Sequence, residues 1–376
     1  MKRSALAFLS IALFSGPSIA QQTVKVANVV ELSGTGTTAG TNFKNGVELA
    51  VKEINAAGGI LGRRIVLDNA DTQSNPAIAK ALTTKAIDND VYVVMGPVFS
   101  GSIMVSMAET RRAEIPNFIG GEAAGITMQG NPYVFRTSFS QATGMPKIAN
   151  YIAAAKARSV AVVFVNNDFG KGGRDQIVKE LGARNIKVAA DISTDAGQVD
   201  FSSVVLRAKQ ANADMLFAYL NEEESARLLR ELRKQGYDKP IVGETTIMGQ
   251  KVIELAGDAA NGVKGHVGLT IDAPNPAIRS FSEKYEREFR SKSDHNGIKG
   301  YTGMYVVKAV TEKMGKFDRK GFAEAIKNAC FSAKQHPGLL MDLCFDDKGD
   351  LDRESFLVEV KGGKQVVVET LPPLKK

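Results

Sequence analysis

Residues 24–57 read VKVANVVELSGTGTTAGTNFKNGVELAVKEINAA, and this stretch decides the fold. The run Val24 to Val30 shows little polar alternation, which is typical of a buried strand, and Gly40 to Ala57 follows with a helical period. The same alternation repeats, with strands expected at 65–69, 91–95 and 115–119 and helices at 76–88 and 102–113. Buried strands joined by crossover helices form a parallel sheet that is covered on both faces, so the stretch predicts an α/β domain.

A second series of the same kind begins near residue 159. Strands are expected at 159–165, 186–192, 214–219 and 240–243, separated by helices at 170–182, 201–211 and 222–235. The length of 376 residues also favours two domains, at about 150 residues each. The tail mixes a strand at 266–271, helices at 276–291, 296–313 and 322–328, and a hairpin of strands 355–360 and 365–368. By its size this tail is not a third compact domain, so we expect it to complete the first two.

The composition is that of an ordinary globular protein. Hydrophobic residues make up 44% and charged residues 24% of the chain, which excludes a disordered, collagenous or coiled-coil protein. Lys and Arg exceed Asp and Glu by only 48 to 41, and the two signs interleave as on a solvated helix surface. We therefore expect no nucleic-acid partner.

The first twenty residues have the three-part pattern of a secretory signal peptide. Lys2 and Arg3 precede an apolar run from Ala5 to Phe14, and small residues lead to Ala20, after which we expect cleavage. The apolar run is much shorter than the roughly 20 residues that span a bilayer, so a retained membrane anchor is the weaker alternative. The mature chain is expected to be exported and soluble.

The chain contains two cysteines, Cys330 and Cys344. In an oxidising compartment an even number of cysteines can pair, and closing this short loop would contribute about 3 kcal/mol of stability. The alternative is two separately buried thiols.

In open parallel sheets, ligands bind outside the carboxyl ends of the strands. The segments that follow the expected strands are 32–36, 96–102 and 120–125 in the first series, and 166–170, 220–222 and 244–246 in the second. Hydroxyl residues such as Thr35 are common in the first set. Ser100 and Ser102 are candidate helix N-caps, where a hydroxyl and backbone N–H groups can hold a carboxylate, although capping without a ligand is the commoner role. Glu222, in an acidic run, either binds an ammonium group or is favoured there by the helix dipole.

Enzyme signatures are weak. Residues 34–39 match the G-x-G-x-x-G/A fingerprint of dinucleotide sites, but the fingerprint also needs an acid about 20 residues further on. Asp68 and Asp71 lie beyond that spacing. The three histidines have no zinc-site spacing, and no G-x-S-x-G nucleophile motif occurs. We therefore expect no cofactor, no metal and no catalytic residue.

Several short motifs, in this order along the chain, are similar to those of one family. They are Leu32-Ser33-Gly34, residues 54–63 (INAAGGILGR), Gly96 to Ser100, Phe135-Arg136-Thr137, Asp168-Phe169-Gly170, Val199-Asp200-Phe201-Ser202 and residues 345–350 (FDDKGD). In them the chain resembles the periplasmic leucine/isoleucine/valine-type binding proteins, which capture ligands for ABC importers of hydrophobic amino acids and related acids. The resemblance covers nearly the whole mature chain.

The resemblance implies a type I periplasmic binding protein fold: two Rossmann-like lobes with parallel sheets, joined by a three-crossing hinge near Ser138, Thr270 and Phe345. One lobe would hold residues 21–138 and 271–345, and the other residues 139–270 and 346–376. The ligand would lie in the cleft between them, and closure of the hinge would bury it.

The resemblance also implies how the ligand is held. In the family, a serine at the position of Ser100 and a loop at the position of Gly121 to Ala123 hold the α-carboxylate of the ligand. The second lobe contributes a ring at the position of Phe169, a residue at Asn221, and an acid near Glu244 or Thr245 that binds the amine.

The sequence departs from this pattern at two positions. Ala123 stands where a threonine is usual and has no hydroxyl, and Asn221 stands where a tyrosine is common. An amino acid needs a carboxylate for its ammonium group, because a buried unpaired charge is costly. Glu122, Glu222 and Glu244 are the candidates for that carboxylate.

A ligand without an amine is the alternative. An aromatic or keto carboxylic acid needs no carboxylate partner, and Phe99, Phe169 and Tyr301 would then stack on an aromatic ligand's ring.

We therefore expect a periplasmic, monomeric, non-enzymatic receptor that captures a small carboxylate-bearing ligand, foremost a hydrophobic or branched-chain amino acid, and delivers it to a membrane permease. A secreted enzyme on the same scaffold is an alternative that lacks a nucleophile or metal set. A ligand-sensing domain of a surface receptor is another, and it would carry an attached membrane segment.

Overall fold

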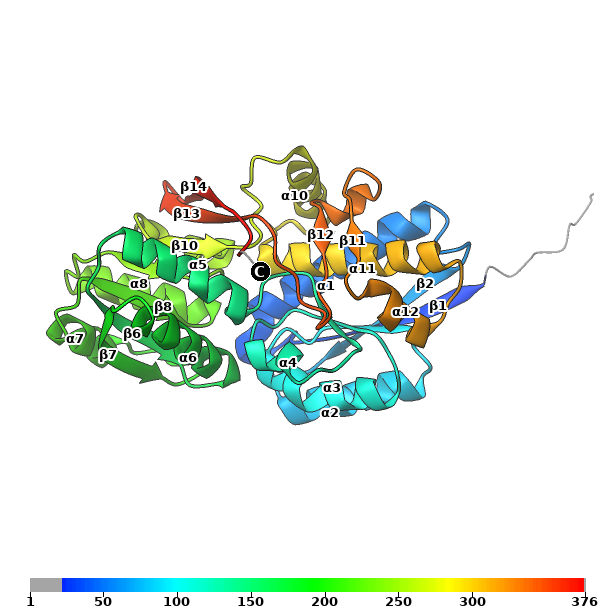
Figure 1. The fold of residues 1–376 in the computed structure, drawn as a ribbon, viewed down its shortest axis with the longest axis horizontal. Helices are drawn as coiled ribbons and strands as arrows, with labels where there is room; N and C mark the ends of the chain where they lie inside the picture. Colours follow the sequence, from blue (N-terminus) through cyan, green and yellow to red (C-terminus); the bar gives the residue numbers. More distant parts are fainter. Residues whose placement is uncertain (1–21, 375–376) are drawn as a thin grey trace, which may run out of the picture.

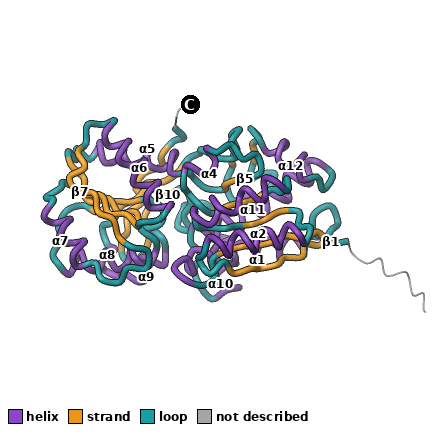
Figure 2. Tube along the Cα trace, turned by 90° about the horizontal axis from the view of Figure 1, so that it is seen from below, coloured by secondary structure: helices purple, strands orange, loops and turns teal. Residues whose placement is uncertain are grey.

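The computed structural model describes residues 22–374, so the expected signal peptide and its cleavage after Ala20 lie outside the described residues. Two α/β lobes lie side by side, each built on one main sheet (Figure 1). Figure 2, turned by 90°, shows helices packed around the strands of each lobe. The predicted α/β class is confirmed.

The first lobe is built on a five-stranded sheet in the order β2-β1-β3-β4-β5, in which all neighbouring strands are parallel. Its strands are β1 (Thr23–Val30), β2 (Arg64–Asp71), β3 (Val93–Met95), β4 (Asn117–Ile119) and β5 (Val134–Arg136). Its helices from the first part of the chain are η1 (Gly34–Gly36), α1 (Thr37–Ala56), α2 (Pro76–Asp88), α3 (Ser100–Arg112) and α4 (Ala124–Met128). The tail adds α10 (Pro276–Phe289), α11 (His295–Met314), α12 (Arg319–Ile326) and η3 (Pro337–Leu339). The helical part of the tail belongs to this lobe, because α11 packs along α1.

The second lobe is built on a seven-stranded sheet in the order β14-β13-β10-β9-β8-β6-β7. Its strands are β6 (Ser159–Val165), β7 (Lys187–Thr194), β8 (Met215–Tyr219), β9 (Ile241–Gly243), β10 (Lys264–Val267), β13 (Ser355–Lys361) and β14 (Lys364–Leu371). Its helices are α5 (Gln141–Ala154), α6 (Asp168–Gly182), α7 (Ser202–Gln210), α8 (Glu222–Lys234), α9 (Gln250–Ala256) and η2 (Gly257–Ala260). The last two strands are antiparallel, as the expected hairpin requires.

Local chemistry explains where several helices begin. Asn75 and Asn275 each cap a helix by accepting hydrogen bonds from the two N–H groups that follow a proline. Proline is suited to the first helical position because that position has no intrahelical N–H partner. This repeated Asn-Pro pair starts α2 and α10 at Pro76 and Pro276, where the sequence predicts them.

One capping prediction is wrong. The N-cap of α3 is Phe99, and Ser100 is the first residue of the helix. The hydroxyl of Ser100 accepts a hydrogen bond from the Ala123 N–H (3.3 Å) rather than capping its own helix. Ser102 lies inside the first turn and is buried.

The predicted disulfide is confirmed. Cys330 and Cys344 are bonded and lie opposite each other in a two-stranded sheet of β11 (Cys330–Phe331) and β12 (Leu343–Cys344).

The chain passes between the sheets three times, after β5, after β10 and after β12. The residue boundaries of the lobes stay a prediction. No helix within residues 22–374 is long and apolar enough to cross a membrane.

Candidate ligand-binding site

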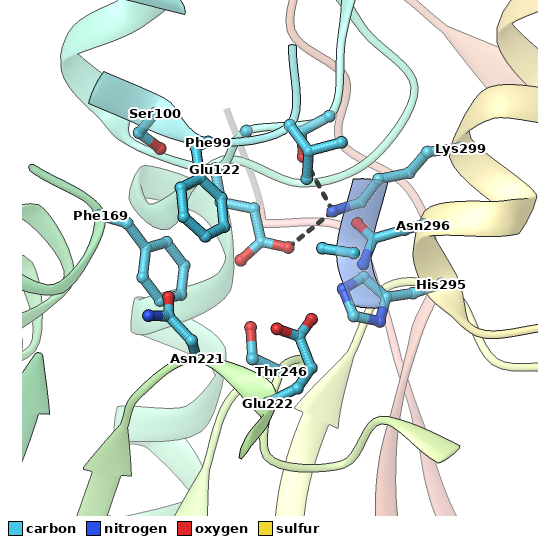
Figure 3. Close-up of a pocket in the computed structure, with 14 residues that line it drawn as sticks. Phe99, Ser100, Glu122, Phe169, Asn221, Glu222, Thr246, His295, Asn296 and Lys299 are labelled. Atoms are coloured by element: carbon cyan, nitrogen blue, oxygen red, sulfur yellow. Dashed lines mark hydrogen bonds and ion pairs between the residues drawn. The ribbon is translucent and has the colours of Figure 1, made fainter. Parts of the chain in front are cut away.

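A cavity lies between the two lobes, where the loops at the carboxyl ends of both sheets meet (Figure 3). It encloses about 350 Å³ of empty space, part of which is open to solvent. The first lobe lines it with Ala39, Val98, Phe99, Ser100, Gly120, Gly121, Glu122, His295, Asn296 and Lys299, and the second lobe with Phe169, Asn221, Glu222 and Thr246. Its position, lined by both lobes, suits one small solute.

The loop between β3 and α3 is held by a buried carboxylate. Glu31, at the end of β1, accepts hydrogen bonds from the N–H groups of Val98 (3.0 Å) and Phe99 (3.1 Å). These contacts fix the residues before α3. The first N–H groups of a helix have no intrahelical partner, so the start of α3 presents N–H donors beside the cavity.

Arg136 holds the neighbouring loop after β4. Its buried guanidinium donates to the carbonyls of Gly121 (2.9 Å) and Ala123 (3.2 Å). The same group forms an ion pair with Asp350 (2.7 Å), which lies between β12 and β13. Arg136 therefore holds this loop in place and ties it to the segment between β12 and β13, along which the chain passes to the second lobe.

A buried ion pair forms one wall of the cavity. Lys299 Nζ lies 2.8 Å from Glu122 Oε1 and donates to the Gly120 carbonyl (3.0 Å). Burial raises the pKa of Glu122, and the adjacent Lys299 ammonium opposes that rise. Tyr219, at the end of β8, donates to the other oxygen of Glu122 (3.3 Å) and accepts a hydrogen bond from Gln141 (3.1 Å). Glu122 thus connects both lobes.

Glu222 has a different environment. It is the first residue of α8, only 4% exposed, and it lines the cavity. Within residues 22–374 no cation lies within ion-pair distance of its carboxylate, and no other residue donates a hydrogen bond to it. Burial, together with the charges of Asp294 and Glu223, raises the pKa of Glu222 to about 8.

The structure brings some of the predicted site residues together. Those that line the cavity are Phe99, Ser100, Gly121, Glu122, Phe169, Asn221 and Glu222. On one side the rings of Phe99 and Phe169 face the cavity, and on the other side lie side chains from α11 (Figure 3). The ring of Phe169 also stacks on Tyr219, with 4.1 Å between the ring centroids.

The other predicted residues do not line the cavity. The Glu244 carboxylate accepts a hydrogen bond from His266 (2.6 Å). Burial raises the pKa of Glu244, but the contact with His266 opposes burial, and the resulting pKa lies below its usual value. Tyr301 donates to Glu53 (2.5 Å) and packs on Phe281. The Glu244 carboxylate and the Tyr301 hydroxyl therefore have partners in the protein, and neither residue lies where it would bind a ligand's ammonium group or stack on a ligand's ring.

The other three predicted residues, Thr35, Ala123 and Thr245, also do not line the cavity. Thr35 is exposed within η1, Ala123 packs in an apolar cluster with Ile103 and Ile126, and Thr245 is buried next to Glu244.

Sequence reasoning missed the contribution of α11. His295, Asn296 and Lys299 line the cavity, although they are far in sequence from the other wall residues. The only sequence signal was a set of polar residues on one end of a helix that is otherwise largely apolar. Among residues 22–374, no group of three or more His, Cys, Asp or Glu side chains is arranged to hold a metal ion.

A family model described as "Periplasmic binding protein" matches residues 23–365. The chain belongs to this family. A leucine-, isoleucine-, valine-, threonine- and alanine-binding protein from Pseudomonas aeruginosa is 26% identical over 355 residues, covering 94% of this chain and 93% of that protein. This periplasmic binding protein has the type I fold that the sequence resemblance implies.

Solved structures have the same fold. One is a branched-chain amino acid transporter substrate-binding protein from Streptococcus pneumoniae in complex with isoleucine (24% identity, TM-score 0.84, 94% of this chain and 100% of that chain). Another is a solute-binding protein of an ABC transporter from R. palustris in complex with benzoate (24% identity, TM-score 0.86, 94% of this chain and 98% of that chain).

Proposed function

We propose that this periplasmic binding protein is the solute receptor of an ABC importer and that it captures an amino acid in the cavity between its lobes. It would bind without chemical change, as a monomer, and deliver the ligand to a membrane permease. The signal peptide would direct the chain to the periplasm and be removed after Ala20. The names of the relatives support this role, and branched-chain amino acids are the first ligands to test because several relatives are named for them.

The observation that carries the proposal is the unpaired carboxylate of Glu222. A buried carboxylate without a cation is unfavourable, and the ammonium group of an amino acid would supply the missing charge. The other wall offers the complementary anion site: the Ser100 hydroxyl, the start of α3 and the loop of Gly121 and Glu122. Together these two ends match the two charges of an α-amino acid.

The ion pair of Glu122 and Lys299 supports the same reading. Each neutralises the other, so the pair adds no net charge to the cavity. Glu222 has no cation of its own within residues 22–374, so the ammonium group of a ligand would stabilise its ionised form.

An aromatic carboxylic acid is the second candidate. The rings of Phe99 and Phe169 line the cavity, and a relative with this fold binds benzoate. Such a ligand would leave Glu222 buried without a cation, so Glu222 would have to stay protonated.

A thermal-shift screen followed by calorimetry tests the function. Amino acids, benzoate and 4-hydroxybenzoate are each added to the purified mature protein, because a ligand that binds the native state raises the melting temperature. We expect at least one amino acid to bind with micromolar affinity, which corresponds to about 8 kcal/mol. Binding of aromatic acids alone would replace the amino acid with the second candidate, and enzymatic turnover of any ligand would refute a pure receptor.

A further inference from the structure

The wall formed by α11 is polar where it meets the cavity. Asp294 caps α11 by accepting hydrogen bonds from the N–H groups of Asn296 (2.8 Å) and Gly297 (3.2 Å), which fixes the first turn of the helix. His295 and Asn296 follow the cap and are 5% and 1% exposed. Lys299 lies one turn further along the same wall (Figure 3).

Several polar groups on this cavity have no partner in the protein. Within the described residues, the Asn221 side-chain nitrogen is buried and makes no hydrogen bond. No hydrogen bond joins the His295 ring or the Thr246 hydroxyl to another residue described by the structure. The polar atoms of His295 and Thr246 are open to the cavity. A bound ligand that covers them would have to supply their hydrogen bonds, because buried polar groups are nearly always paired.

The charges around the wall restrict what that partner is. Glu122 and Lys299 already pair with each other, and Glu222 would pair with the ligand's ammonium group. A charged ligand side chain would therefore be buried without an opposite charge. Burial, and then the charge of Lys299, lower the pKa of His295 well below its usual value. Its neutral ring therefore offers one donor and one acceptor.

We propose that the side chain of the bound amino acid carries a neutral hydrogen-bonding group, a carboxamide or a hydroxyl, that contacts His295, Asn296 and Thr246. This inference rests on the proposed function and narrows it from amino acids in general to polar ones. A branched aliphatic side chain fills the same space but leaves the His295 ring and the Thr246 hydroxyl unpaired. The Asn296 side chain already donates to Asp294 (3.5 Å). A site built to hydrogen-bond a polar group on its ligand strongly rejects an analogue that lacks this group. An apolar pocket rejects an analogue with an added hydroxyl much less strongly.

Ligands matched in size test the inference in the wild-type protein. Asparagine is compared with leucine, and threonine with valine, by calorimetry at constant pH. We expect the polar member of at least one pair to bind about tenfold or more tightly than its apolar counterpart. Leucine and valine binding as tightly as asparagine and threonine, or more tightly, would overturn the inference and leave the proposed function intact. Failure of every amino acid to bind would overturn both.

Variants of α11 residues test which side chains produce the preference for a polar ligand. Asn296→Leu and His295→Phe are expected to reduce the asparagine-to-leucine affinity ratio about tenfold, because each removes a hydrogen-bonding group. His336→Phe, half-buried outside the cavity before η3, is the matched control and is expected to leave the ratio unchanged. An unchanged ratio in both wall variants would contradict the assignment. The wild-type comparison still decides the proposal if a wall variant does not fold.

Discussion

Glu222 makes amino-acid binding depend on pH in a direction and by an amount that can be measured. Its pKa in the empty cavity is about 8, so at neutral pH the carboxyl is mostly protonated. An ammonium group pairs with the ionised form, and binding therefore has to release this proton. Affinity should rise with pH until about pH 8, by about tenfold per pH unit, or about 1.4 kcal/mol.

Glu222 also makes folding stability depend on pH, and here stability falls as pH rises. A carboxyl whose pKa is raised by folding stabilises the native state fully below its unfolded pKa of 4.5, and this contribution is lost as pH rises towards 8. The difference is about 5 kcal/mol at its largest. Glu222→Gln should therefore stabilise the empty protein at pH 8, and the gain should shrink towards pH 5.

Calorimetric titrations from pH 6 to pH 8, in buffers of different ionisation enthalpy, measure both affinity and proton release. We expect nearly one proton to be released per amino acid bound at pH 6 in the wild type, and none from this group in Glu222→Gln. The variant should also bind more weakly above pH 8, by about 2–5 kcal/mol, because it leaves the ammonium group unpaired. Glu254→Gln, exposed on α9, is the control and should behave like the wild type. Affinity that does not change with pH, or an identical pH profile in Glu222→Gln, would refute the reasoning.

Three further changes test other parts of the structure. Ser100→Ala should weaken amino-acid binding by about 1–3 kcal/mol if its hydroxyl serves the ligand carboxylate, and unchanged calorimetric affinity would exclude that role. Replacing Cys330 and Cys344 by serine should lower the free energy of unfolding by about 3 kcal/mol in urea titrations without altering affinity, and equal stability of the two forms would contradict this. Arg136→Leu should destabilise the fold by about 3–5 kcal/mol, because it removes the buried member of the ion pair and leaves the partly buried Asp350 without its cation; a melting temperature equal to that of the wild type would show that the pair is not needed.

Much of the fold follows from local sequence signals. The central strands, such as β6 and β8, are short apolar runs. The Asn-Pro pairs at 75–76 and 275–276 mark two helix starts by a mechanism that works within a few residues. Helix α5 was not predicted, because Gly144 and Pro146 interrupt the helical pattern. Contacts made by its other residues in the second lobe, which sequence periodicity does not show, stabilise it.

The site was only partly predictable for a related reason. Strand-end loops correctly indicated where the cavity lies, and they supplied Ser100, Glu122 and Glu222. Which carboxylate is free depends on partners distant in sequence. Lys299 pairs with Glu122 and His266 holds Glu244, so that Glu222 alone of the three has no partner within residues 22–374.

A crystal structure of the mature protein with an amino acid selected by the binding screen tests the central claim most directly. The account predicts the ligand between the two lobes, with its ammonium nitrogen within hydrogen-bonding distance of the Glu222 carboxylate and its carboxylate at Ser100 and the loop of Gly121 and Glu122. A ligand bound outside this cavity, or with its ammonium group away from Glu222, would contradict it.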